Sequence, residues 1–69
     1  MNDCDVIKDI VYMLASGAEP DEVIPYDLSG MSPDCIMEIC ALYITHGKDE
    51  GRKEICRNMI YACRTDSSL

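Results

Sequence analysis

Residues 32–47 read S-P-D-C-I-M-E-I-C-A-L-Y-I-T-H-G, and this stretch predicts a helix with start and stop signals. Ser32 can cap its N-terminus with the hydroxyl, and Pro33 suits the first helical position, where an N–H has no intrahelical partner. Gly47 is expected to adopt the left-handed conformation that ends many helices. Between these ends apolar residues lie on nearly all sides, which is typical of a helix buried by its neighbours. We therefore expect this helix to be the centre of a small all-helical domain.

Two further long helices are predicted from the spacing of their apolar residues. The first covers about 3–16 and ends at Gly17, a residue suited to a helix end. The last covers about 50–64 and is capped by Asp49. Its short link to the central helix implies that these two helices are antiparallel neighbours. The residues expected to form the common core are Ile7, Ile10, Val11, Leu14, Ile36, Ile39, Cys40, Tyr43, Ile55, Met59 and Ile60.

The segment between the first and central helices is rich in proline, serine and glycine. A short helical turn is expected near 20–24, since Pro20 suits a helix start and the residue before Pro25 avoids helical angles. The predicted fold is therefore all-α, a compact bundle of three main helices plus one short turn. A chain of this length forms one domain, which we expect to cover 1–64 and to be followed by a flexible tail at 65–69.

Five cysteines stand at positions 4, 35, 40, 56 and 63. Their odd number and the lack of an export signal favour free thiols in an intracellular, cytoplasmic protein over a disulfide framework. Zinc sites are typically built from C-x2-4-C pairs, whereas Cys35 and Cys40 point about 140° apart on a helix. His46 is the only histidine that could act as a ligand or a base. The sequence therefore predicts no metal, no cofactor and no catalytic site.

The charge is unevenly distributed along the chain. Residues 1–47 hold nine acidic residues and one base, Lys8, whereas residues 48–69 hold five bases and four acids. The acidic part would repel nucleic acid, because affinity for nucleic acid depends largely on neutralising phosphates. It would be attracted to a basic protein surface instead. No run of 18 or more apolar residues is present, so no membrane span is expected.

These features predict a non-catalytic protein–protein interaction module whose acidic surface over 19–38 meets the basic surface of another protein. The expected partner handles nucleic acid, and this chain would inhibit it by occupying its basic surface. Small acidic helical proteins of phages and plasmids often act in this way, an analogy of size and charge only. A homodimer is another way to cover the apolar residues of so short a chain. The residues predicted to bind the partner are Glu19, Asp21, Glu22, Tyr26, Asp27, Met31, Asp34 and Glu38.

The alternative interpretation is a small DNA-binding regulator of the helix-turn-helix type over 20–39. Gly30 and Ile36 stand where this motif has its turn glycine and an apolar residue six positions later. Against it, Pro25 interrupts the first helix, and the second helix begins Ser-Pro-Asp-Cys, without a base to meet phosphate or read a base edge. The remaining basic patch, expected to lie outside the core of the last helix, comprises Arg52, Lys53, Arg57 and Arg64.

Overall fold

The computed structural model describes residues 4–67, and this part of the chain contains four helices. They are α1 (Cys4–Ala15), α2 (Pro20–Val23), α3 (Pro33–His46) and α4 (Glu50–Ser67), which confirms the predicted all-α fold. α4 continues beyond its predicted end at residue 64. The predicted start of the first helix, at about residue 3, and the end of the predicted tail lie outside the described residues, so the division into domain and tail stays a prediction. Among the helices described, none is both long enough and apolar enough to cross a membrane.

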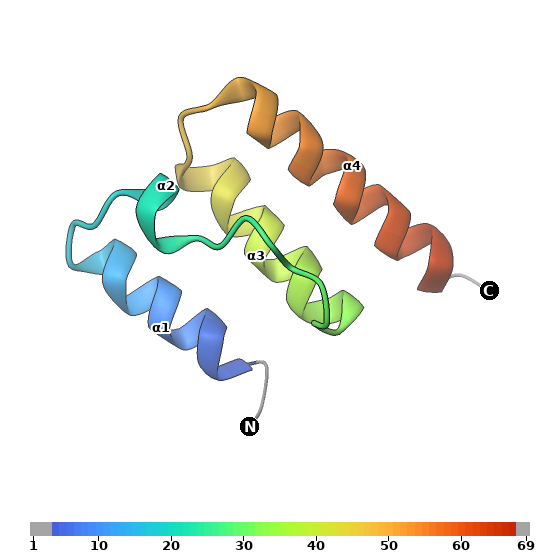
Figure 1. The fold of residues 1–69 in the computed structure, drawn as a ribbon, viewed down its shortest axis with the longest axis horizontal. Helices are drawn as coiled ribbons and strands as arrows, with labels where there is room; N and C mark the ends of the chain where they lie inside the picture. The colour runs from blue at the N-terminus through green and yellow to red at the C-terminus, as the bar shows by residue number, and fades with distance from the viewer. Residues whose placement is uncertain (1–3, 68–69) are drawn as a thin grey trace.

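The three long helices lie side by side with α3 in the middle (Figure 1). α4 runs antiparallel to α3, as predicted, and forms the largest helix–helix contact with it. After α2, residues 24–31, here called the strap, return across one face of α3 (Figure 1). The molecule extends over 39 × 31 × 16 Å. It is thus a slab, because one helix with its side chains is already about 10–12 Å across.

The N-terminal ends of α3 and α4 have the predicted caps. The Ser32 hydroxyl accepts a hydrogen bond of 3.3 Å from the backbone N–H of Cys35. Asp49 Oδ1 accepts hydrogen bonds from the backbone N–H groups of Gly51 at 3.0 Å and Arg52 at 3.4 Å. Both caps satisfy donors that the helix itself leaves without partners.

The predicted role of Gly47 is wrong. Its φ of −70° and ψ of 163° are an extended conformation, so α3 does not end at a left-handed residue. Glycine is needed here for space, because a Cβ would lie 2.6 Å from the carbonyl oxygen of Tyr43 and would also collide with its ring. Within the described residues, the glycines with positive φ are Gly17 at 97° and Gly30 at 86°.

The core lies where α1, the strap and α4 meet α3. Its largest fully buried side chains are those of Ile10, Ile39, Cys40 and Tyr43. The strap adds Ile24, Leu28 and the partly buried Met31, which were not among the residues predicted to form the core.

Two predicted core residues are largely exposed, which corrects the predicted core. Val11 on α1 is 47% exposed and Ile55 on α4 is 59% exposed. The reason is the slab shape: α1 and α4 each have a long helix beside them on one side only. The other predicted core residues outside the fully buried set are partly buried against the core, namely Ile7, Leu14, Ile36, Met59 and Ile60.

No disulfide joins the cysteines whose side chains the structure describes. Cys35, Cys40 and Cys56 are buried and Cys63 is half-buried, and none of the four is in a disulfide. The side chain of Cys4, also predicted to be a thiol, lies outside the described part of the structure. Over residues 4–67, no group of three or more His, Cys, Asp or Glu side chains is placed to hold a metal ion.

Candidate functional site

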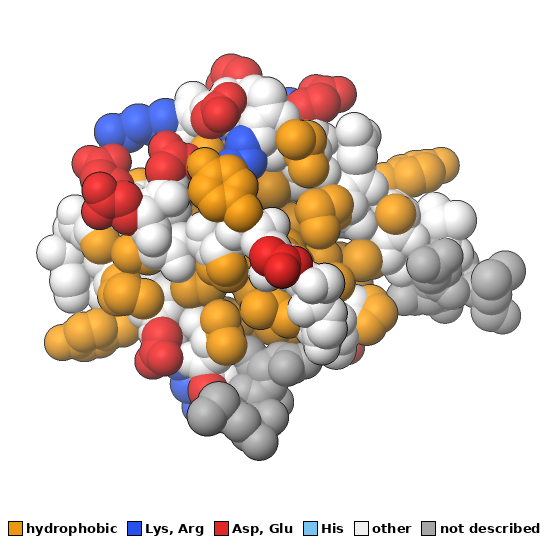
Figure 2. Space-filling view, viewed as in Figure 1, with side chains coloured by type: hydrophobic (Ala, Val, Ile, Leu, Met, Phe, Trp, Pro, Cys, Tyr) orange, Lys and Arg blue, Asp and Glu red, His pale blue; other side chains and the backbone are white. Residues whose placement is uncertain are grey.

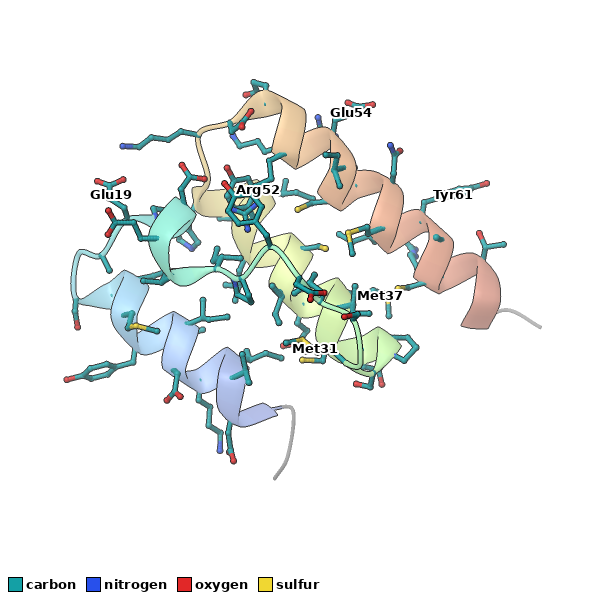
Figure 3. The ribbon with its side chains drawn as sticks, viewed as in Figure 1. Glu19, Met31, Met37, Arg52, Glu54 and Tyr61 are labelled. Atoms are coloured by element: carbon teal, nitrogen blue, oxygen red, sulfur yellow. The ribbon has the colours of Figure 1, made fainter. Side chains whose placement is uncertain are left out.

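Arg52 joins the strap to α4 from a buried position (Figure 3). It is only 8% exposed, and its Nη2 donates hydrogen bonds to the carbonyl oxygens of Ile24 at 2.9 Å and Pro25 at 3.1 Å. The guanidinium carbon lies 3.6 Å from the ring centre of Tyr26 and 4.2 Å from that of Tyr43. A flat cation between two aromatic faces keeps favourable electrostatic contacts after it has lost its water. Arg52 therefore holds the beginning of the strap against α4.

The prediction that Arg52 belongs to an exposed basic patch is wrong. A signal for its burial was present in the sequence, because Arg52 stands four positions before Cys56 and seven before Met59. This spacing continues the buried face of α4 by one turn toward its N-terminus. Lys53 and Arg57 form ion pairs with the acidic residues three positions before them, Glu50 and Glu54.

Tyr43 links three helices through a short chain of hydrogen bonds. Its hydroxyl donates to Asp21 Oδ1 on α2 at 2.5 Å and accepts from the backbone N–H of Asp49 at 3.3 Å. Arg52 Nη1 lies 3.5 Å from the same Asp21 oxygen. Burial, together with the hydrogen bond to Asp21, raises the pKa of Tyr43, so the hydroxyl keeps the proton that it donates. These bonds fix α2, α3 and the start of α4 to one another.

A cleft of about 500 Å³ lies between the strap and α4, next to Arg52. Its volume is within the range typical of binding pockets in proteins. Tyr26 on the strap and Ile55 on α4 form opposite edges of the cleft and are 74% and 59% exposed. The buried side chains of Ile39 and Cys40 line it from α3. The full lining comprises Ile24, Pro25, Tyr26, Leu28, Ile39, Cys40, Asp49, Gly51, Arg52, Ile55, Cys56 and Met59.

Two thiols line the inner part of this strap–α4 cleft. Cys40 of α3 and Cys56 of α4 interact with each other, and burial, with a smaller effect from Cys56, raises the pKa of Cys40 to about 12. A cysteine acts as a nucleophile or metal ligand only as a thiolate. The thiol of Cys40 is therefore inert near neutral pH and serves as part of the apolar floor.

Three of the eight residues predicted to bind a partner lie at α2. Glu22 is exposed there, and Glu19, just before the helix, is exposed and forms an ion pair of 3.4 Å with Lys48. Asp21 is also exposed, with 42% of its side chain accessible, but its Oδ1 accepts the hydrogen bond from Tyr43. Its carboxylate thus serves the fold, a role that sequence reasoning did not find.

Three more of the predicted residues lie in the strap. The Tyr26 side chain is largely exposed, although one face of its ring covers Arg52. Asp27 accepts hydrogen bonds from the Ser29 hydroxyl at 2.6 Å and the Ser29 backbone N–H at 3.0 Å, which lower its pKa and keep it ionised. Met31 is half-buried and packs against the core.

The last two predicted residues, Asp34 and Glu38, lie on α3 outside the lining of the cleft. Both are exposed, and Glu38 lines a separate hollow between α1 and α3 together with Val11 and Leu42. The acidic surface predicted over 19–38 is therefore divided. The structure brings part of it close to the strap–α4 cleft and leaves Glu38 at a different hollow.

Figure 2 shows the molecule from the side of the strap. Apolar side chains form a broad area in the middle of this face, and acidic groups stand along its upper edge and within it. Asp49 lines the cleft at the start of α4, and Asp27 stands between the lining residues Tyr26 and Leu28 of the strap. The cleft is thus an apolar surface with carboxylates around it.

Comparison with known proteins gives no match: no family model, no curated protein and no solved structure matches this chain. Function must therefore be inferred from the site itself.

Proposed function

We propose that this chain is a non-catalytic protein–protein interaction module that binds the basic surface of another protein. Its binding surface is the strap face, defined as α2, the strap and residues 49–59. The observation that carries the proposal is the exposed apolar cleft with carboxylates around it. A single layer of helices leaves apolar side chains on the surface that a second layer would normally cover. Apolar patches with a polar rim are typical of surfaces that bind other proteins.

The charge of the strap face supports a basic partner. Glu22 and Asp27 are exposed acids, and the structure gives neither of them a cation as a partner. Arg52, the cation nearest the cleft, is already bound by two carbonyl oxygens and two aromatic rings. A basic surface would be drawn to this face by long-range attraction and held in register by the acids.

We propose a nucleic-acid-handling protein as the partner, because such proteins have the basic surfaces that this face would occupy, and binding would inhibit the partner. The proposed setting is the cytoplasm, where the thiols of Cys35, Cys40 and Cys56, none of which is in a disulfide, would stay reduced.

The geometry offers less support for the helix-turn-helix alternative. That motif joins two helices by a turn of about 3–4 residues. Here α2 has four residues, and residues 24–32 separate it from α3. Direct binding to nucleic acid therefore enters the experiment below as the competing outcome.

The proposal is tested by affinity capture with the tagged chain in a nuclease-treated lysate of its source cells. We expect one partner in a stoichiometric amount, with retention that falls as the salt concentration rises. A set of partners that disappears after nuclease treatment would favour the helix-turn-helix alternative. Capture of no protein would refute the proposed function.

Two variants of equal net charge locate the surface that binds. The first, Glu22→Gln with Asp27→Asn, removes two charges from the strap face, and the control, Asp9→Asn with Glu38→Gln, removes two from α1 and α3. All four residues are exposed, so the fold should tolerate both changes. We expect the first variant to weaken capture about tenfold at low salt and the control to change it little. Equal weakening by both would mean attraction by net charge without a defined surface.

A further inference from the structure

We propose that the strap–α4 cleft binds the apolar face of a basic amphipathic helix belonging to the partner protein. This inference rests on the proposed function and specifies it, because it names the kind of segment that the strap face would bind.

The cleft is already formed without a partner. Arg52 ties Ile24 and Pro25 of the strap to α4 by two hydrogen bonds, and the ring of Tyr26 packs on its guanidinium. The hydrogen bonds that join the Tyr43 hydroxyl to Asp21 and to the backbone of Asp49 fix the same end of the cleft. A partner would therefore not have to order this surface, and a pre-organised surface loses less entropy on binding.

The edge formed by α4 matches the surface of a second helix. Ile55 and Met59 are one turn apart on α4 and both line the cleft, so they form part of a ridge of the i, i+4 type. Helices pack by fitting such ridges into the grooves of a neighbour. Ile55 is 59% exposed, and Tyr26, which is 74% exposed, lines the cleft from the strap. A helix that inserts apolar side chains at i, i+3 or i+4, and i+7 would cover both residues.

The charges around the cleft select a basic helix. Asp27 stands between the lining residues Tyr26 and Leu28 at the strap edge, and Asp49 lines the cleft at the start of α4. Lysine or arginine residues on either side of an apolar face would thus meet carboxylates at both edges. An acidic helix of the same shape would be repelled, which gives the site its specificity.

A synthetic helix tests this inference without knowledge of the partner. The probe is a peptide of about 15 residues, long enough to form a helix, with leucines and one tryptophan on one face and lysines on the other. The chain itself contains no tryptophan, so the fluorescence reports only on the peptide. A control peptide has the same composition, with its apolar residues distributed around the helix.

We expect saturable binding of the amphipathic peptide with a blue-shifted tryptophan emission, and at least about tenfold weaker binding of the control peptide. Ile55→Glu should weaken binding about tenfold although it adds a negative charge, because it removes an apolar edge of the cleft. Val11→Glu adds the same charge at another exposed apolar position, on α1, and should leave the affinity unchanged.

Three results would overturn the inference: no binding of the amphipathic peptide, equal binding of both peptides, or wild-type affinity of the Ile55→Glu variant. Each of them leaves the proposed function open to its own test, because capture from the lysate detects any partner that the strap face binds, whether or not that partner inserts a helix into the cleft. Conversely, capture of no partner would refute the proposed function even where the peptide binds the cleft.

Discussion

Replacing Arg52 with methionine should be among the most destabilising single changes in this chain. Methionine keeps an unbranched apolar stem of similar length, so the packing of the stem is largely preserved. It removes both hydrogen bonds to the strap and both contacts with aromatic rings. The carbonyl of Ile24, which belongs to a buried residue, would then lose its partner on α4.

The size of the effect follows from these losses. An unsatisfied buried acceptor costs about 1–3 kcal/mol. Each contact of the guanidinium with a ring contributes about 0.5–2 kcal/mol. The terms do not add fully, because they belong to one group and methionine avoids the cost of desolvating a cation. We expect a loss of about 3 kcal/mol in the free energy of unfolding, against a total of about 3–10 kcal/mol for a chain of this length.

The loss is measured by urea unfolding followed by circular dichroism in the far ultraviolet. Arg57→Met on the same helix is the matched control, because Arg57 forms a surface ion pair with Glu54 that contributes at most about 1 kcal/mol. The midpoint for Arg52→Met should fall far below that of Arg57→Met, or the variant should be unfolded in buffer. Equal midpoints would refute the role of Arg52 as the link between the strap and α4.

Three further substitutions test the packing of two glycines and the pH dependence of stability. Gly47→Ala should lower the free energy of unfolding, measured in urea, by about 1–3 kcal/mol, because the new Cβ would collide with Tyr43. Gly51→Ala should raise it by up to about 1 kcal/mol, because a Cβ has room in the exposed first turn of α4. A loss of stability at Gly51 similar to that at Gly47 would contradict the steric argument. The raised pKa of Cys40 means that the folded chain keeps a proton that the unfolded chain loses above its ordinary pKa of 9.0, so stability is full below about pH 9 and falls as the pH rises toward 12. The slope from this one group is at most about 1.4 kcal/mol per pH unit; Cys40→Ala should flatten the alkaline decline, and an unchanged slope would show that Cys40 does not cause it.

The helices were predictable because their signals are local. Periodic apolar residues, the caps at Ser32 and Asp49, and the prolines at 20, 25 and 33 each act within one or two turns of the chain. The predicted ends of α1 and α2 lie within one residue of those in the structure, the bounds of α3 are the same, and α4 ends three residues later than predicted.

The candidate site was less predictable because its parts are distant in sequence. Arg52 is charged, and a charged residue is normally assigned to the surface unless its partners are known. Those partners lie in the strap, 27 and 28 positions earlier, and the spacing of apolar residues along α4 gives no information about them. Asp21 was assigned to a binding surface for the same reason, since its bond to Tyr43 spans 22 positions. Val11 and Ile55 obey helical spacing, but only the slab arrangement determines which faces have a neighbour.

The most direct test of the proposed binding surface is hydrogen–deuterium exchange of this chain, alone and in complex with its captured partner. The proposal predicts slower exchange in the complex over the strap, residues 24–31, and over residues 50–59 at the start of α4. Exchange over α1 should stay unchanged. Slower exchange confined to α1 and the neighbouring side of α3, with the strap unaffected, would contradict the proposal. It would place the binding surface at the hollow between α1 and α3.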